Sequence, residues 1–118
     1  MPDDRPILAL VRDLMFASRI TATAAEAEVC VKLIRDPAKL GIEPGRRLIV
    51  DLNLDGAIAA AGAWRAATEG DVVGFVSHTD AAAIEEARAA GVHRVLARSR
   101  FVEVLPALLT ASDHADGS

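Results

Sequence analysis

Polar side chains that can do chemistry stand directly after four apolar stretches of the chain. They are, in chain order, Arg12 and Asp13, Asp51 and Asn53, Ser77 and His78, and Arg98 and Ser99. A carboxylate can act as a nucleophile or a metal ligand, a hydroxyl can donate a hydrogen bond, and a guanidinium can balance the charge of an oxyanion. These side chains are candidates for catalysis or ligand binding, provided that the fold brings the four stretches together.

Five apolar runs, separated by alanine-rich segments, are the elements that must position these side chains. The runs are ILALV from Ile7, VCVKLI from Val29, LIV from Leu48, VVGFV from Val72 and RVLA from Arg94. Continuous apolar strands are buried on both faces, which requires a parallel sheet with helices above and below it. In such sheets ligands bind at the carboxyl ends of the strands, so the polar pairs are expected along one edge. Lys32 interrupts the second run, which indicates an edge strand.

Apolar residues at helical spacing predict which helix faces are buried. Helices are expected after Asp13, from about Ala57, and from Thr79 or Asp80 to Gly91. Their buried residues should be Phe16, Ile20, Ala24 and Ala27; Ala60, Trp64 and Ala67; and Ile84, Ala87 and Ala90, respectively.

Proline and glycine limit two further helical segments. After the second strand, Asp36 can cap a helix with Pro37 at its first position, but the sequence up to Gly45 leaves room only for a short or irregular segment. In the last helix Pro106 is tolerated near the first turn, so a start between Val102 and Leu105 is expected. Its buried residues should be Leu105, Leu108 and Leu109.

Length and composition describe one soluble domain. The 118 residues are 52% hydrophobic and 25% charged, and we expect a domain over residues 1–111 followed by a disordered tail, 112–118. The net charge of −4 argues against nucleic-acid binding, and the apolar runs are too short to span a membrane. A cytoplasmic location is expected. The single cysteine, Cys30, is expected to be a buried strand residue.

Two classes of site are excluded by the sequence. The first turn after a strand, VRDLMFAS, has no glycine, so it cannot approach a pyrophosphate as a dinucleotide site does. The three histidines and one cysteine show no metal-ligand spacing.

The stretch LIVDLNLDG resembles the third strand and phosphoacceptor loop of response-regulator receiver domains, whose usual form is close to D-x-N-L-P-G. The VS that ends the fourth strand and the AAGVHRVLARS around the fifth fall where a receiver has them, so the resemblance covers about the whole chain. It implies a flavodoxin-like (βα)5 fold with a parallel five-stranded sheet of order 2-1-3-4-5. It also implies the roles of four residues: Asp51 as phosphoacceptor, Asp13 and the Asn53 carbonyl as magnesium ligands beside Asp51, and Ser77 as the hydroxyl that bonds a phosphoryl oxygen.

Four positions depart from the receiver pattern. Arg12 replaces one of two adjacent acids that bind magnesium, and Arg98 and Ser99 stand where the family has lysine and proline. Val95 occupies the position of the aromatic switch residue. Because a guanidinium supplies no oxygen ligand, Arg12 should leave the magnesium site weak or absent. Arg12 and Arg98 are instead expected to point at Asp51 and hold its carboxylate as an ion pair without metal.

These features together predict a stand-alone, atypical receiver-like protein that is not an enzyme and signals through protein contact. The partner would be a histidine kinase or a downstream signalling protein. A homodimer is also possible through one charged face, which comprises Glu85, Glu86, Arg88, Arg94 and Arg100. Two alternatives stay open: a genuinely phosphorylated single-domain regulator in a histidine-kinase phosphorelay, and a small anion-binding flavodoxin-like domain.

Simpler structural roles are also open for several of these residues. Asp51 can be a polar strand end, and Asp13 can act only as the cap of the first helix. Asp55 and Gly56 suit a turn, His78 a solvated loop, and Trp64 the core.

Overall fold

A computed structural model describes residues 5–76, 81–92 and 94–110 of the chain. Five parallel strands form one sheet in the order β2-β1-β3-β4-β5, which confirms the predicted flavodoxin-like architecture and strand order. The strands are β1 (Ile7–Leu10), β2 (Val31–Ile34), β3 (Arg47–Asp51), β4 (Asp71–Val76) and β5 (Arg94–Ala97).

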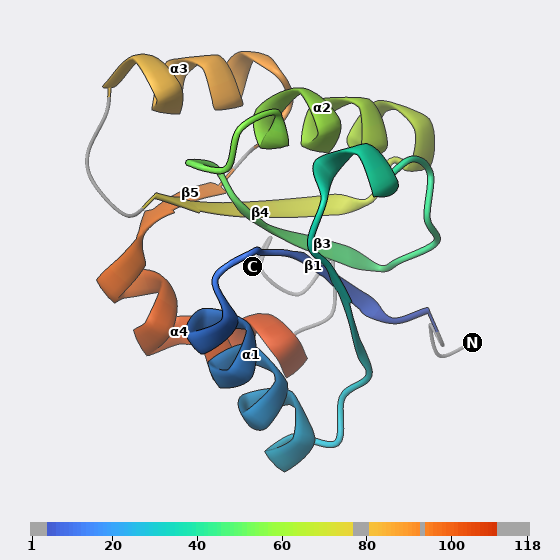
Figure 1. Ribbon diagram of the computed structural model, residues 1–118, viewed down its shortest axis with the longest axis vertical. Coiled ribbons are helices and arrows are strands. Elements are labelled where there is room, and N and C mark those ends of the chain that lie inside the picture. The colour runs from blue at the N-terminus through green and yellow to red at the C-terminus, as the bar shows by residue number, and fades with distance from the viewer. Residues whose placement is uncertain (1–4, 77–80, 93, 111–118) are drawn as a thin grey trace.

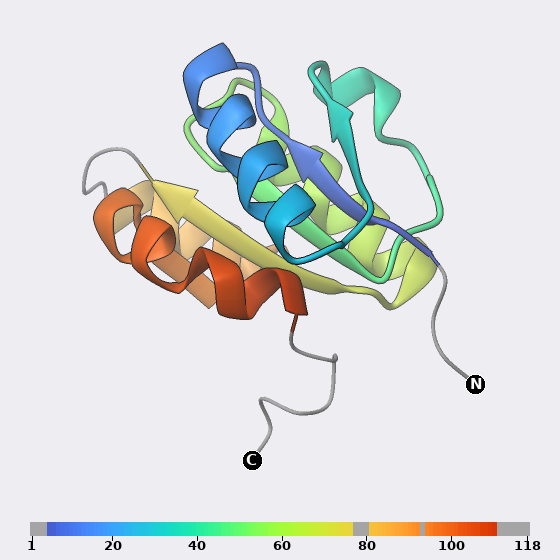
Figure 2. The ribbon, with the colours of Figure 1, turned by 90° about the horizontal axis from the view of Figure 1, so that it is seen from below.

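Helices cover both faces of this sheet (Figure 1). On one face lie α1 (Leu14–Glu26) and α4 (Arg98–Thr110), and on the other lie α2 (Ala57–Thr68) and α3 (Ala81–Ala89) together with the short 3-10 turn η1 (Pro37–Lys39). Figure 2, seen from below, shows α1 and α4 side by side under the strands. No helix within the described residues is long and apolar enough to cross a membrane.

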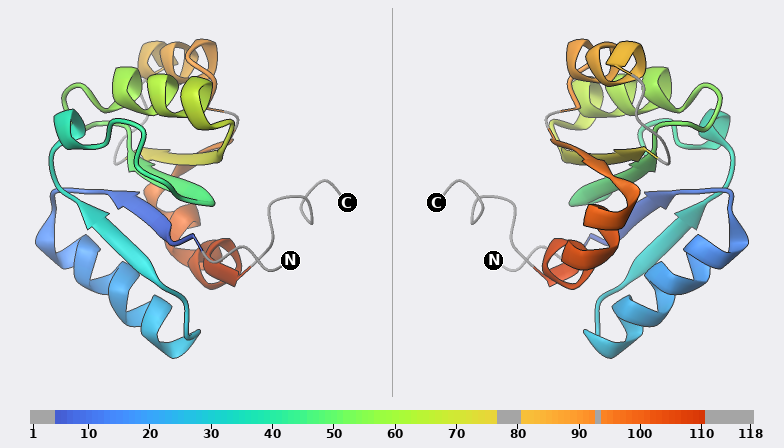
Figure 3. Two further views of the ribbon diagram at one scale, coloured as in Figure 1. Left: turned by 90° about the vertical axis from the view of Figure 1, so that its right-hand side faces the viewer. Right: turned by 90° about the vertical axis from the view of Figure 1, so that its left-hand side faces the viewer.

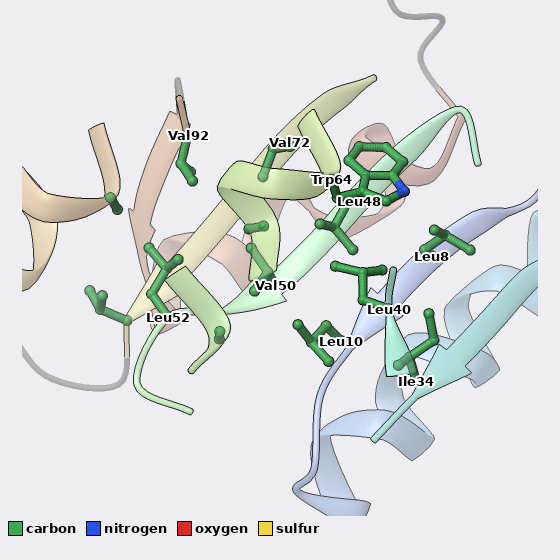
Figure 4. Packing of buried hydrophobic residues seen from close by; sticks show 14 residues of the cluster. Leu8, Leu10, Ile34, Leu40, Leu48, Val50, Leu52, Trp64, Val72 and Val92 are labelled. Carbon is green, nitrogen blue, oxygen red and sulfur yellow. The ribbon is translucent and has the colours of Figure 1, made fainter. Parts of the chain in front are cut away.

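Alternate residues of the strands pack into two separate hydrophobic cores, one on each face of the sheet. Leu8 and Leu10 of β1 pack towards α2, whereas Ile7 and Ala9 pack towards α1 and α4. Figure 4 shows the first core, with Trp64 of α2 lying over Leu48 of β3. The central strands are almost wholly buried, as continuous apolar runs predict. In β2 Lys32 is exposed and the strand lies at the sheet edge, as predicted.

The start of α1 follows the sequence prediction. Asp13 is its N-cap, and the Asp13 Oδ1 accepts hydrogen bonds from the backbone N–H groups of Met15 at 2.9 Å and Phe16 at 3.3 Å. Phe16, Ile20 and Ala24 are buried as expected, with Ala17 beside them. Ala27 is the C-cap and only half-buried.

The segment after β2 is a single 3-10 turn, which confirms the expected short element. Asp36 Oδ1 accepts from the Ala38 N–H at 3.0 Å, and Pro37 occupies the first helical position. The chain then returns to β3 past Glu43, whose carbonyl accepts a hydrogen bond from Trp64 Nε1 at 2.8 Å. This bond satisfies the one polar group of a fully buried indole, so Trp64 is a core residue as expected.

Two helix faces differ from the prediction. In α2 the buried residues are Ala57, Ala61 and Trp64, while Ala60 is half-buried and Ala67 is exposed, so the buried stripe begins one helical turn earlier than predicted and ends at Trp64. In α3, Ala87 is buried, but Ile84 and Ala90 are only half-buried. The expected caps of α3, Thr79 and Asp80, lie outside the described residues.

The start of the last helix was predicted wrongly. α4 begins at Arg98, directly after β5, so Pro106 is the ninth residue of the helix rather than part of its first turn. An interior proline costs roughly 3 kcal/mol relative to alanine. The early start is favoured because it adds Phe101 to the buried stripe of Leu105, Leu108 and Leu109, and the Phe101 ring stacks on Phe75 with centroids 4.5 Å apart.

Cys30 was also predicted wrongly. It is exposed and precedes β2 instead of lying within a buried strand. The physical reason is its place at the start of an edge strand, where fewer side chains cover the backbone. The predicted domain limit at residue 111 and the tail 112–118 stay predictions, since these residues lie outside the described part.

Candidate functional site

The predicted site residues follow strands whose carboxyl ends meet at one edge of the sheet. Asp51 is the last residue of β3 and lies in register with Phe75 of β4. Asp13 follows β1, and Arg98 follows β5. The parallel arrangement thus brings three separate stretches of sequence to the same edge. Ser77 and His78, predicted to complete the site, lie outside the described residues.

Asp51 is half-buried at the centre of this edge. Its Oδ1 accepts a hydrogen bond from the Asn53 N–H at 3.0 Å, which fixes the first turn of the loop towards α2. Burial raises the pKa of the Asp51 carboxyl above its ordinary value, and the negative charge of Asp13 acts in the same direction. The Asn53 N–H and the positive charge of Arg98 lower this pKa, but less than burial raises it.

Asp13 has two simultaneous roles. While its Oδ1 caps α1, its Oδ2 lies 3.5 Å from Nη2 of Arg98. The side chains of Asp13 and Arg98 are 47% and 42% exposed, so water weakens this ion pair. Helix capping is therefore a role that Asp13 fulfils, and the bond to Arg98 is an addition that the sequence did not reveal.

A cluster of three phenylalanine rings beneath Arg98 was not predicted from the sequence. The Arg98 guanidinium carbon lies 4.5 Å from the centroid of the Phe16 ring, a cation–π contact. Phe16 packs on Phe75 and on Phe101, with ring centroids 4.7 and 5.4 Å apart. These are all three phenylalanines of the chain. They come from α1, β4 and α4, so no local pattern in the sequence could have grouped them.

The structure corrects the expected clamp of two arginines on Asp51. Within the described residues, Arg98 pairs with Asp13 and affects Asp51 only through its charge. Arg12 lines a surface hollow on the other side of β1, together with Asp36, Pro37, Ala38, Asp55, Gly56 and Ala60. The physical reason is the extended backbone after β1, because consecutive side chains there point to opposite sides. Asp13 therefore faces Arg98, and Arg12 faces away.

The donors suggested for magnesium are Asp13, Asp51 and the Asn53 carbonyl, and the two carboxylates among them already have partners within the protein. Both Asp13 oxygens are engaged, one with α1 and one with Arg98, and one Asp51 oxygen accepts from Asn53. In the part of the chain that the structure describes, no three His, Cys, Asp or Glu side chains come together as a metal site. Magnesium requires a near-octahedral set of oxygens, and Arg12 contributes none.

The predicted dimer face lies at the β5 edge of the sheet. Glu85, Glu86 and Arg88 are exposed on α3. Two of its arginines have partners within the chain, since Arg94 pairs with Asp71 at 3.5 Å and Arg100 pairs with Glu103 at 3.0 Å. Only part of this charged face is thus left for contacts with another protein.

No protein-family profile and no curated protein matches the sequence. Among solved structures, a response regulator from Burkholderia pseudomallei, determined with a phosphorylated aspartic acid, a calcium ion and citrate, is 18% identical with a TM-score of 0.76, over 96% of this chain and 69% of that chain. A chemotaxis protein of Vibrio cholerae is 18% identical with a TM-score of 0.74, over 89% and 95%. The beryllofluoride-activated NtrC4 receiver domain dimer is 13% identical with a TM-score of 0.69, over 88% and 95%.

These three structures are a response regulator, a chemotaxis protein and a receiver domain, and this chain covers 69%, 95% and 95% of them, respectively. Identities below one fifth leave the side chains of the site free to differ while the backbone arrangement is kept. The chain has the CheY-like fold of response-regulator receiver domains.

Proposed function

We propose that this chain is an atypical receiver-type signalling protein, which acts through contact with a partner protein and does not depend on magnesium-assisted phosphorylation of Asp51. The observation that carries the proposal is the ion pair of Arg98 with Asp13, an acid whose other oxygen is bound to the start of α1. A metal ion would therefore have to compete with Arg98 for this carboxylate.

The chemistry of phosphoryl transfer supports this proposal. Transfer to a carboxylate requires that cations balance the charge that spreads over the phosphoryl oxygens. Here the described cation near Asp51 is Arg98, whose side chain is 42% exposed and shared with Asp13. Arg12, which replaces an acid in the receiver pattern, lies on the far side of β1 and supplies neither a metal ligand nor a charge to Asp51.

In this proposal the chain transmits its signal by binding a partner protein, without phosphorylation of Asp51. The exposed charges of α3, on Glu85, Glu86 and Arg88, form a surface that a histidine kinase, a downstream protein or a second copy of this chain can bind. A related fold supports the last option, because the NtrC4 receiver domain was solved as a dimer. Charge reversal on α3 should weaken this contact.

The test is the intact mass of the full chain after incubation with acetyl phosphate and magnesium. We expect no gain of a phosphoryl group in the parent protein. Arg12→Asp, which restores an acid pair in the sequence before α1, is the matched variant and is also expected to stay unmodified, because position 12 lies on the far side of β1 from Asp51. A labile gain in Arg12→Asp that is lost on combination with Asp51→Asn would show that an acid at position 12 does reach the site.

A second function, phosphorylation within a histidine-kinase relay, is favoured by the half-buried Asp51 at the strand end and the positive charge of Arg98 near it. A labile phosphoryl group on the parent protein that is lost in Asp51→Asn would select this function and overturn the first proposal. Modification that persists in Asp51→Asn would show that another side chain reacts, and it would support neither function.

A further inference from the structure

The outer edge of β2 presents unused backbone hydrogen-bonding groups. Within the described residues β2 pairs only with β1, and Figure 3 shows β2 at the rim of the sheet between α1 and η1. The Ile7 N–H donates to the Cys30 carbonyl and the Val11 N–H to the Ile34 carbonyl, each at 3.0 Å. Because alternate residues of a strand turn their backbone groups to opposite sides, the N–H and C=O groups of Val31 and Leu33 face outward.

The side chains along this edge do not prevent another strand from pairing with it. A lysine on an edge strand usually blocks pairing, but Lys32 forms an ion pair with Glu43 on the η1 side. Leu33, on the opposite side of the strand, is 38% exposed. The strand edge therefore offers both a backbone ladder and an apolar contact.

Positive charge gathers at the same place. A surface hollow runs along the edge and is lined by Lys32, Leu33, Ile34, Arg35, Asp36, Lys39 and Glu43. These side chains include three cations and two carboxylates, in a chain whose net charge is −4. Lys32 and Glu43 neutralise each other, and Arg35 and Lys39 are exposed and make no ion pair with any described residue. The hollow thus has an excess of positive charge.

We propose that the outer edge of β2 binds an extended, acidic segment of a partner protein as a sixth strand of the sheet. The backbone groups of Val31 and Leu33 supply the ladder, and Arg35 and Lys39 select acidic residues. The exposed charges of Arg35 and Lys39 favour an acidic segment over a second copy, whose own β2 edge carries the same excess of positive charge. This surface does not involve Asp51, so the proposal stands apart from the proposed function.

The alternation of side chains along β2 predicts which residue types the bound segment carries at successive positions. Leu33 and Arg35 are two residues apart and so point to one side of the strand. An apolar residue of the segment should lie over Leu33, and an acidic residue two positions away should reach Arg35. On the other side, an acidic residue should lie near Lys39. The sequence Glu-Val-Val-Glu satisfies this pattern in either direction of the added strand.

The test is the titration of the full-length, 15N-labelled chain with the peptide Gly-Glu-Val-Val-Glu-Gly, followed by two-dimensional NMR. We expect the backbone amide signals of Val31 to Lys39 to shift, with those of α3 and α4 unchanged. A peptide with lysine in place of both glutamates should cause no shift. Arg35→Glu combined with Lys39→Glu should weaken binding by roughly five- to tenfold. Arg100→Glu, a matched reversal of an exposed arginine on α4, should leave the binding unchanged.

Three outcomes would overturn the proposal. The first is an absence of shifts at millimolar peptide, and the second is equal binding of the lysine peptide. The third is concentration-dependent shifts of the same amides without peptide, which would make a second copy the occupant. Asp51→Asn should retain the binding, so failure of this proposal and failure of the proposed function are separate results.

Discussion

Two arginine–aspartate pairs stand at opposite ends of the sheet, and they differ in burial and in closeness. At the amino ends of the strands, Arg47 of β3 is fully buried, and its Nε lies 2.6 Å from Asp71 Oδ2. At the carboxyl ends, Arg98 and Asp13 are both about half exposed and lie 3.5 Å apart. A buried pair at hydrogen-bond distance is fixed, whereas an exposed pair is screened by water and exchanges partners at little cost.

The amino end also fixes the last helix. Arg47 Nη1 donates to the Leu108 carbonyl at 2.5 Å, and Arg46 Nη2 donates to the Leu109 carbonyl at 3.2 Å. The last carbonyls of a helix lack partners within the helix, so the two arginines act as a C-terminal cap for α4. The amino end of the sheet therefore contributes stability, while the end with Asp51 keeps charged groups that can change partners.

The largest expected effect is at the buried pair. Arg47→Ala leaves Asp71 with the weaker partner Arg94 and removes the bond to the Leu108 carbonyl, so the free energy of unfolding should fall by about 3 kcal/mol. Chemical denaturation followed by circular dichroism measures this change. Arg47→Met, which keeps much of the volume without the charge, should lose less than Arg47→Ala. Equal stability of Arg47→Ala and the parent would remove the contrast between the two ends.

A smaller effect is expected at the exposed pair. Asp13→Ala loses both the cap of α1 and the partner of Arg98, and should cost about 1 kcal/mol in the same denaturation experiment. Asp13→Asn is the matched control, because asparagine caps a helix about as well as aspartate but forms no ion pair. Its stability should stay close to that of the parent. If Asp13→Asn costs as much as Asp13→Ala, the ion pair matters more than the cap.

The smallest effect concerns Asp51 and has a defined pH dependence. Burial raises the pKa of Asp51 above its ordinary value of 3.8, so the folded state binds this proton more tightly than the unfolded state does. The parent should therefore lose stability relative to Asp51→Asn as the pH rises from about 3.8 through the raised folded value, with no further change above it. Melting temperatures at pH 4 and pH 7 test this sign. A stability difference between parent and Asp51→Asn that is equal at pH 4 and pH 7, or that moves in favour of the parent as the pH rises, would contradict it.

The fold was predictable because its signals are local and repeated. Five continuous apolar runs require burial on both faces, and the charge of Lys32 marked one strand for the edge; the structure confirms both. The capping roles of Asp13 and Asp36 also follow from residue type alone. The start of α4 was not predictable in this way, because proline statistics disfavour an interior Pro106, and only the packing of Phe101 on Phe75 outweighs them.

For the candidate site, too, the sequence predicted some features and only the structure showed the others. The sequence by itself determined which residues end the strands, and therefore that Asp13, Asp51 and Arg98 share one edge of a parallel sheet. The tertiary structure alone decided which of them touch. Arg12 and Asp13 are neighbours in sequence but face opposite sides of β1, and Arg98 rests on Phe16 beside Asp13 instead of on Asp51. Side-chain direction and the meeting of three distant phenylalanines depend on packing between elements, which no local pattern encodes.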